Sequence, residues 1–351
     1  MKTVSLFEAV SRTQWRNSRL VILGYHGISF EDEHEWDPSY FVTRELLAQR
    51  LEWLKAEGFS VLPLETAIGA LFSGELPERS VVLTFDDGFY NFYKLGQPLL
   101  AAYGVPSTVY LTTYYSEDNR PVLGVTASYM LWKRRNRTVR LTAVPEVSQT
   151  VDLSGREMRD AVVTALQTHA ASAGFGADEK HALLRSLAAD IGFDFETFCE
   201  SRVLNLMTPV EAREMSAAGV DIQLHTHRHR TPMDETLFRR EIEDNATRIE
   251  GITGRKPRHF CYPSGVYDPR FLPWLRELGV ISAVTCDPGI CSRDANALLL
   301  PRFLDTCGVS QTDFESWVSG ALPLLYSGIK PHGARAQRGR GASASKKPSD
   351  A

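Results

Sequence analysis

Short apolar runs alternate with longer amphipathic segments along the first third of the chain. Three runs of mainly aliphatic residues predict buried strands, at 20–25, 80–85 and 107–111. Apolar residues at helical spacing mark the segments between them, at 43–57, at 65–73 and from Gly88 to about Tyr103. Strands and helices in this order indicate parallel strands with helices packed outside them, which is an α/β fold.

The alternation stops at about residue 118 and returns at Thr208. Between these points the strand signals fade and the segments 155–171 and 178–189 have helical spacing, which predicts a helical insertion at about 118–206. Thr208, Pro209 and Glu211 then stand where a helix start with a capping box requires them. Beyond this helix, the sequence predicts further strands and a charged helix, at 220–224, 259–262 and about 234–252.

The end of the chain has a different composition from the rest. Residues 328–351 are rich in Gly, Ala, Ser and basic side chains and show no apolar pattern. Such a segment cannot bury enough apolar surface to offset the entropy of ordering it. We therefore predict one domain over residues 1–327, including the insertion, followed by a disordered basic tail.

Composition and charge make several classes of protein improbable. The chain of 351 residues is 43% hydrophobic, enough for a large core, and its net charge of −4 gives no basic field for nucleic acid. No apolar stretch has the length of a transmembrane helix, and no signal peptide is recognisable. The five cysteines favour free thiols in a reducing compartment. We expect a cytoplasmic protein, with peripheral contact at the inner membrane face and the oligomeric state left open.

Two clusters of polar residues follow predicted strands and together indicate a metal site. Asp86 and Asp87 come directly after the strand at 80–85, and His225 and His229 follow the strand at 220–224. One carboxylate and two imidazoles form a ligand set for Zn²⁺ or a similar divalent metal with open positions. The second carboxylate is then free to take a proton from water, an arrangement that suits hydrolysis of an amide or ester.

These motifs resemble those of a known family. TFDDGF at 84–89, HTHRH at 225–229 and FCYPSG at 260–265 are similar, in order, to the first three motifs of the polysaccharide deacetylases, the NodB-homology carbohydrate esterases. The resemblance covers about residues 21–305, except the insertion. It implies a distorted (β/α) barrel of about seven parallel strands. An early Tyr25-His26 pair is closest in style to the poly-N-acetylglucosamine deacetylase branch.

The resemblance also implies roles for individual residues. Asp86 would be the general base, and Asp87, His225 and His229 would bind the metal. Thr226 would shape the loop between the two histidines. In the third motif, the backbone N–H of Ser264 would stabilise the oxyanion of the substrate, with Tyr262 and Gly265 beside it. The metal would be Zn²⁺ by default, with Co²⁺, Ni²⁺ or Fe²⁺ compatible with the same ligands.

The chain departs from the family pattern at two catalytic positions. Many members carry an Arg that contacts the catalytic Asp, but Cys261 occupies that position, so Arg302 is the candidate substitute and an ordinary ion pair is its alternative. The usual Leu-x-His motif near the C-terminus is missing, which makes His26 the candidate general acid and a structural core histidine the alternative.

The function predicted from the sequence is removal of N-acetyl groups from an amino-sugar glycan, with release of acetate. The substrate would be an N-acetylated glycan or a lipid-linked or nucleotide-linked sugar. Two alternatives remain open: a hydrolase of a small non-sugar amide that uses the same site, and a degenerate barrel that binds glycan without catalysis. The exact glycan and the acetyl position are not determined by the sequence.

Overall fold

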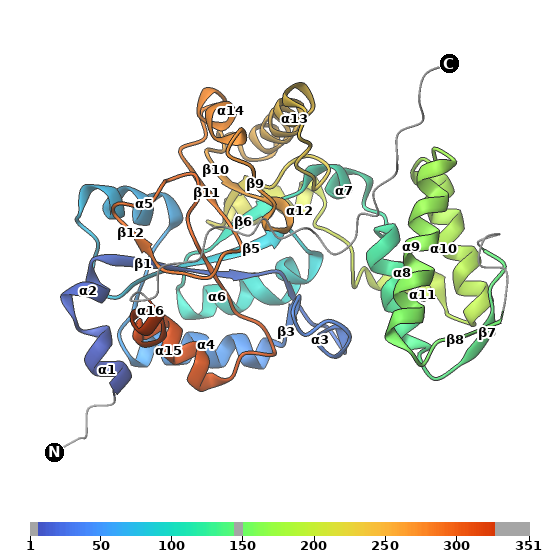
Figure 1. Ribbon diagram of the computed structural model, residues 1–351, viewed down its shortest axis with the longest axis horizontal. Coiled ribbons are helices and arrows are strands. Elements are labelled where there is room, and N and C mark those ends of the chain that lie inside the picture. The colour runs from blue at the N-terminus through green and yellow to red at the C-terminus, as the bar shows by residue number, and fades with distance from the viewer. Residues whose placement is uncertain (1–5, 144–149, 327–351) are drawn as a thin grey trace.

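The computed structural model describes residues 6–143 and 150–326 (Figure 1). Its centre is a sheet in which six strands follow one another in parallel register. These are β11 (Ser282–Val284), β10 (His259–Cys261), β9 (Asp221–Leu224), β6 (Thr108–Leu111), β5 (Ser80–Asp87) and β1 (Arg19–Tyr25). Their carboxyl ends therefore meet at one edge of the sheet, where such folds place their functional residues.

A last segment joins the two ends of this sheet. Leu300 bridges Val284 of β11 in parallel, and β13 (Phe303–Leu304) pairs with β1 in parallel. The segment thus closes the sheet into a small barrel with seven strand positions. Two short strands lie outside this path: β12 (Cys291–Ser292) runs antiparallel to β1, and β4 (Ser60–Val61) pairs with the start of β5. The predicted α/β barrel of about seven parallel strands is confirmed.

Helices surround the strands (Figure 1). Those of the barrel are α1 (Leu6–Ser11), α2 (Gln14–Asn17), α3 (Glu33–Trp36), α4 (Arg44–Ala56), α5 (Leu64–Ser73), α6 (Gln97–Tyr103), α12 (Pro209–Ala217), α13 (Glu235–Thr253), α14 (Phe271–Glu277), α15 (Gln311–Ser319) and α16 (Ala321–Tyr326). A π-helix, Phe92–Gly96, precedes α6, and a short strand pair, β2 (Gly27–Ile28) with β3 (Phe41–Val42), follows β1.

Local signals in the sequence explain where two of these helices begin. The Thr43 hydroxyl accepts a hydrogen bond from the backbone N–H of Leu46 at the start of α4. At the start of α12, Thr208 and Glu211 form the predicted capping box. These caps satisfy backbone donors that the first helical turn leaves unpaired. The barrel core is formed by alternate strand residues packed against the inner faces of the helices, among them Leu23, Leu83 and Phe260.

The insertion forms a lobe at one side of the barrel (Figure 1). It contains α8 (Leu123–Lys133), α9 (Arg156–Ser172), α10 (Ala177–Ile191) and α11 (Phe195–Ser201), whereas α7 (Thr113–Asp118) precedes it and lies against α13 of the barrel (Figure 1). The lobe also contains a short antiparallel pair, β7 (Thr138–Arg140) with β8 (Thr150–Asp152), which the sequence did not predict. Its apolar core continues into the barrel through Phe41 and Phe89. Phe89 follows Asp87 by two residues in the sequence.

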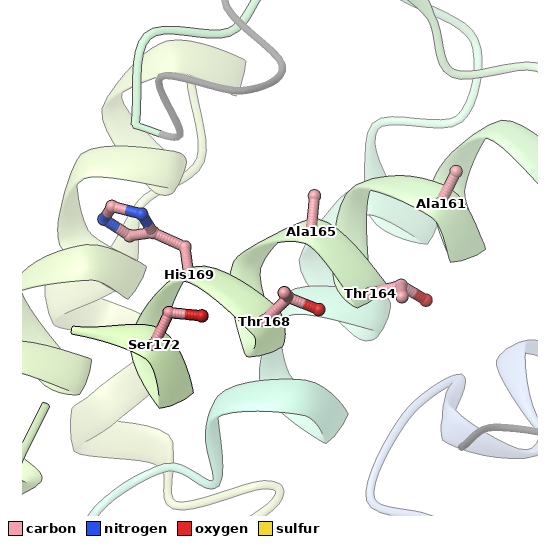
Figure 2. A pocket seen from close by; sticks show the side chains of 6 residues that line it. All are labelled: Ala161, Thr164, Ala165, Thr168, His169 and Ser172. Carbon is pink, nitrogen blue, oxygen red and sulfur yellow. The ribbon is translucent and has the colours of Figure 1, made fainter. Parts of the chain in front are cut away.

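Helix α9 of the insertion lines a hollow. Figure 2 shows the six side chains of α9 that line it: Ala161, Thr164, Ala165, Thr168, His169 and Ser172. None of these residues is acidic, and none belongs to the motifs that signal catalysis, so the hollow is not a candidate for the active site.

Two further predictions concern the C-terminal tail and membrane-spanning helices. The predicted disordered tail at 328–351 lies outside the described residues. Within the described part of the chain, no helix combines the length and the apolar character needed to cross a bilayer.

Candidate active site and metal centre

The carboxyl end of β5 delivers the two adjacent aspartates to the mouth of the barrel. Both side chains are largely buried. Asp87 has a left-handed backbone with φ of 68°, and Gly88 follows with φ of 84°. The chain therefore turns sharply at this point, and the two carboxylates face different partners. A left-handed non-glycine residue is disfavoured and occurs mainly where surrounding contacts hold it, often at functional sites.

Asp87 faces the two predicted metal-binding histidines. Its Oδ1 lies 3.2 Å from Nε2 of His225 and 3.2 Å from Nε2 of His229. The two imidazole rings meet edge to face with centroids 4.9 Å apart. Three donor atoms from β5 and from the loop after β9 therefore converge on one point, as the sequence predicted.

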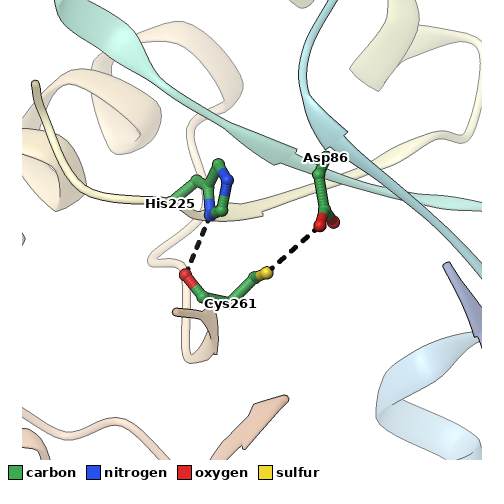
Figure 3. A group of neighbouring side chains, drawn as sticks. All are labelled: Asp86, His225 and Cys261. Atoms are coloured by element: carbon green, nitrogen blue, oxygen red, sulfur yellow. Dashed lines mark hydrogen bonds between the residues drawn. The ribbon is translucent and has the colours of Figure 1, made fainter. Parts of the chain in front are cut away.

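The hydrogen bonding of His225 shows that this point suits a cation. Its Nδ1 lies 2.8 Å from the carbonyl oxygen of Cys261 (Figure 3). Because a carbonyl only accepts, Nδ1 carries a proton, and in the neutral ring Nε2 then directs a lone pair at the Asp87 carboxylate. Two facing acceptors repel each other unless a positive charge lies between them, which a proton or a metal ion can supply. The donor set of Asp87, His225 and His229 therefore fits a divalent metal.

Burial and the two histidines shift the pKa of Asp87 in opposite directions. Burial alone would raise the pKa of this carboxyl, but His229 and His225 hold the pKa well below its ordinary value. The carboxylate is therefore ionised at neutral pH, the form that binds metal.

Tyr40 is a site residue that the sequence did not reveal. Its hydroxyl donates a 2.6 Å hydrogen bond to Oδ2 of Asp87, the oxygen that faces away from the histidines. Its ring stacks on His26 with centroids 4.1 Å apart. Tyr40 lies just before β3, in a segment without motif character, so only the folded chain brings it to the site.

Asp86 is held by a fully buried arginine. Nη1 and Nη2 of Arg302 each lie 2.8 Å from one carboxylate oxygen of Asp86, which makes a bidentate pair. The guanidinium is itself oriented by the carbonyl of Thr285 and the hydroxyl of Thr84. Burial would raise the pKa of Asp86, but Arg302 outweighs it and lowers this pKa to about 2. The candidate substitute for the missing family arginine is thus in place.

Cys261 packs against both Asp86 and Arg302. Its Sγ is 3.4 Å from Oδ2 of Asp86 (Figure 3). The same sulfur is 3.2 Å from Nη2 of Arg302. Burial raises the pKa of this thiol well above its ordinary value, so it is protonated. Asp86, His225 and Cys261 also lie close enough to form a second donor set. A neutral thiol and a carboxylate already held by Arg302 make that set a poorer metal site than the one at Asp87.

His26 follows β1 and lies beside Asp86. Its Nε2 is 3.8 Å from Oδ2 of Asp86, beyond hydrogen-bond distance, and its ring is partly open to solvent. Burial lowers the pKa of this imidazole, while Asp86 and Asp87 act to raise it. The lowered pKa means that the ring is mainly neutral at pH 7 in the resting site.

The third motif forms a tight turn after β10. Ser264 is exposed and has a left-handed φ of 56°, and Gly265 has φ of 67°. A Cβ at Gly265 would lie 2.7 Å from the Cβ of Cys286, so glycine is required there for space as well as conformation. The ring of Tyr262 is buried and its hydroxyl donates to the Leu298 carbonyl, which leaves only its backbone to face a substrate.

The middle residues of the histidine motif have structural partners. The Thr226 hydroxyl accepts a hydrogen bond from the Arg230 backbone N–H, which supports its predicted role in shaping the loop. His227 is buried, and its Nδ1 lies 2.9 Å from the Thr113 hydroxyl, so this histidine is committed to the packing behind the metal centre.

Comparison with known proteins identifies the family. A family model described as polysaccharide deacetylase matches residues 73–283, more than half of the chain. The chain belongs to the polysaccharide deacetylase family. Membership implies a hydrolase that acts on amide bonds. A poly-beta-1,6-N-acetyl-D-glucosamine N-deacetylase of Escherichia coli (strain K12) is 32% identical over 94 residues, 26% of this chain and only 14% of that relative's length.

Solved structures of deacetylases share the fold. The deacetylase PplD of Streptococcus pyogenes, solved in complex with acetate, superposes with a TM-score of 0.57 at 20% identity, over 86% of this chain and 98% of that one. IcaB of Ammonifex degensii superposes with a TM-score of 0.53 at 18% identity, over 86% and 97% of the two chains. At these identities the likeness establishes the barrel and not the substrate.

Proposed function

We propose that this chain is a metal-dependent deacetylase that hydrolyses the N-acetyl groups of an amino-sugar glycan and releases acetate. The observation that carries the proposal is that two adjacent carboxylates have different partners. Asp87 faces two histidines at the predicted metal centre, whereas Asp86 is held apart by Arg302. A protein that only binds glycan has no need for a second buried carboxylate beside a metal site.

The proposed cofactor is a divalent cation bound by Asp87, His225 and His229. When bound there, it would polarise the acetamide carbonyl and lower the pKa of a water molecule. Two imidazoles and one carboxylate favour Zn²⁺, and Co²⁺, Ni²⁺ and Fe²⁺ are compatible with the same donors.

The residues of the chain would divide the proton transfers between them. Asp86 is ionised and would accept the proton of the attacking water, because a carboxylate oxygen has lone pairs beyond those that Arg302 occupies. His26 is neutral in the resting site, and its Nε2 lies 3.8 Å from Oδ2 of Asp86. It would take up the proton that Asp86 has accepted from water and pass it to the departing amine, which returns both groups to their starting states. The exposed turn at Ser264 would offer its backbone N–H to the oxyanion.

N-acetylglucosamine oligomers are the substrates to test first. The name of the Escherichia coli relative refers to the beta-1,6-linked polymer, and we carry that linkage to this chain as a proposal. Acetate release should be measured from beta-1,6-linked and beta-1,4-linked oligomers and from small ureide-like amides, with added Zn²⁺ or Co²⁺. Release from the oligomers supports the proposal. Release only from the small amides would indicate a hydrolase of a small non-sugar amide. Metal binding without any release would favour a barrel that binds glycan without catalysis.

A further inference from the structure

The two metal-binding histidines lie on a loop in an unfavourable backbone conformation. This ligand loop, residues 225–230, includes Thr226 with φ of 64° and His229 with φ of 52°. Both values are in the left-handed region, which side chains with a Cβ adopt only when other contacts impose it. Something outside the loop must therefore hold it.

Asn245 of α13 holds the first half of the ligand loop. The side chain is completely buried, and its Oδ1 accepts a 2.9 Å hydrogen bond from the backbone N–H of His225. Its Nδ2 donates to the carbonyl of Leu111 and to the hydroxyl of Thr113, each at 3.0 Å. One amide thus ties the first histidine ligand to the end of β6 and the start of α7.

Glu241 holds the second half of the ligand loop from the same helix. It lies four residues before Asn245, so the two side chains share one face of α13. Its Oε2 accepts a 2.8 Å hydrogen bond from the backbone N–H of Arg228, and its Oε1 accepts one of 2.7 Å from Nε of Arg230. Its backbone carbonyl accepts from the N–H of His227. Glu241 is 1% exposed, although it carries a charge.

The first two residues of α7 hold the opposite side of the same loop. The Thr113 hydroxyl lies 2.9 Å from Nδ1 of His227, and the Tyr114 backbone N–H donates to the His227 carbonyl at 2.8 Å. The loop is therefore clamped between α13 and α7, with Asn245 bonded to both sides. These contacts fix the backbone from which both imidazoles extend towards Asp87.

We infer that Glu241 and Asn245 are positioning residues that set the affinity of the metal centre, although neither contacts the donor atoms. The inference rests on the proposed function, because it assumes that Asp87, His225 and His229 bind the metal. Without Glu241 or Asn245, the loop is free to leave its left-handed conformation. The two Nε2 atoms would then no longer converge on Oδ1 of Asp87, and metal would bind only after the loop is ordered again.

The test is the Zn²⁺ affinity of the full chain, measured by competition with a chromophoric chelator. Glu241→Gln keeps the size of the side chain but replaces one acceptor oxygen with a donor. It should lower the Zn²⁺ affinity by about 10–100-fold, and the visible absorption of the Co²⁺-loaded protein should change. Asp244→Asn is the matched control on the same helix. Asp244 approaches the Arg228 guanidinium at 3.8 Å and has no hydrogen bond to the loop backbone among the described residues, so affinity should stay unchanged.

A lower melting temperature of Glu241→Gln with Zn²⁺ affinity within twofold of the unsubstituted chain would overturn the inference. If Glu241→Gln does not fold, Arg230→Gln replaces it, because the Arg230 side chain is half exposed and supplies one of the bonds to Glu241. It should lower the affinity several-fold, and an unchanged affinity would again overturn the inference. Normal Zn²⁺ affinity of the unsubstituted chain without acetate release would contradict the proposed function and leave this test intact.

Discussion

Arg302 binds both oxygens of Asp86, with each Nη 2.8 Å from one oxygen, although Arg302 is 216 residues away along the chain. The segment that carries Arg302 is the one that closes the barrel between β11 and β1. Closure of the barrel and placement of the Asp86 carboxylate therefore depend on the same few residues. The cation that the third motif lacks at Cys261 reaches Asp86 from the segment between β11 and β1 instead.

Removal of this guanidinium should destabilise the protein. Arg302→Met leaves the Asp86 charge buried without a partner, and breaking such a pair typically costs about 3–5 kcal/mol of unfolding free energy. Chemical denaturation measures the loss. The double variant Asp86→Asn/Arg302→Met should recover part of it, because no uncompensated charge is left. Equal losses in the single and double variants would show that the pair contributes only through packing.

Substitution of His26 should reduce turnover more than binding. If His26 protonates the departing amine, His26→Ala should lower kcat by about 10²–10⁴-fold and leave KM largely unchanged. Steady-state kinetics on an N-acetylglucosamine oligomer checks this. His181→Ala, on α10 of the insertion, is the control and should keep full activity. A decrease of kcat below tenfold in His26→Ala would assign the acid to another group.

The Tyr40 hydroxyl should contribute to metal affinity through Asp87. Tyr40→Phe keeps the ring that stacks on His26 and removes only the 2.6 Å hydrogen bond to Oδ2. Loss of such an orienting bond typically lowers metal affinity by about 10-fold or more. Calorimetric titration with Zn²⁺ measures it. Unchanged Zn²⁺ affinity together with lower activity would instead place the role of Tyr40 on the substrate or on His26.

The buried His259 should make the protein less stable in acid. Its ring lies 2.7 Å from the Ser282 hydroxyl and 2.8 Å from Oε2 of Glu65, with Arg258 and Asp221 as the other charged neighbours. Burial lowers the pKa of this histidine, so the unfolded chain binds the proton first. The stabilisation is complete above the unfolded value of about 6.5 and is lost as the pH falls from there towards the lowered folded pKa.

The measurement is the melting temperature of the unsubstituted chain and of His259→Gln at pH 7.5 and 5.5. The unsubstituted chain should lose more stability between these two pH values than the variant does. An equal loss in both proteins would mean that other groups account for the acid sensitivity.

The sequence predicted the parts of the site that follow strong local patterns. The apolar strand before Asp86 and Asp87 places both carboxylates at a strand end, and the four-residue spacing of His225 and His229 gives two imidazoles that can converge. Parallel strands bring their carboxyl ends together, so these local signals suffice to predict that Asp87, His225 and His229 lie together. Thr208 and Glu211 likewise identify the start of α12 by their own chemistry.

The remaining parts depend on contacts between distant segments, which periodicity does not encode. Tyr40 lies in a short connection and Glu241 on a charged helix, where an acidic residue usually faces solvent. Only the packing of α13 against the histidine loop buries Glu241. The β7–β8 pair was missed because its strands are three residues each, too short for a recognisable alternation.

In the proposed mechanism Asp86 is the catalytic base and does not bind the metal. Acetate release and bound Zn²⁺ should be measured together in the unsubstituted chain and in Asp86→Asn, with an N-acetylglucosamine oligomer as substrate. If Asp86 is the base, Asp86→Asn should keep its Zn²⁺ and lose activity by about 10²–10⁴-fold. Loss of Zn²⁺ from Asp86→Asn would show that Asp86 binds the metal, and acetate release at an undiminished rate would show that Asp86 is not the base.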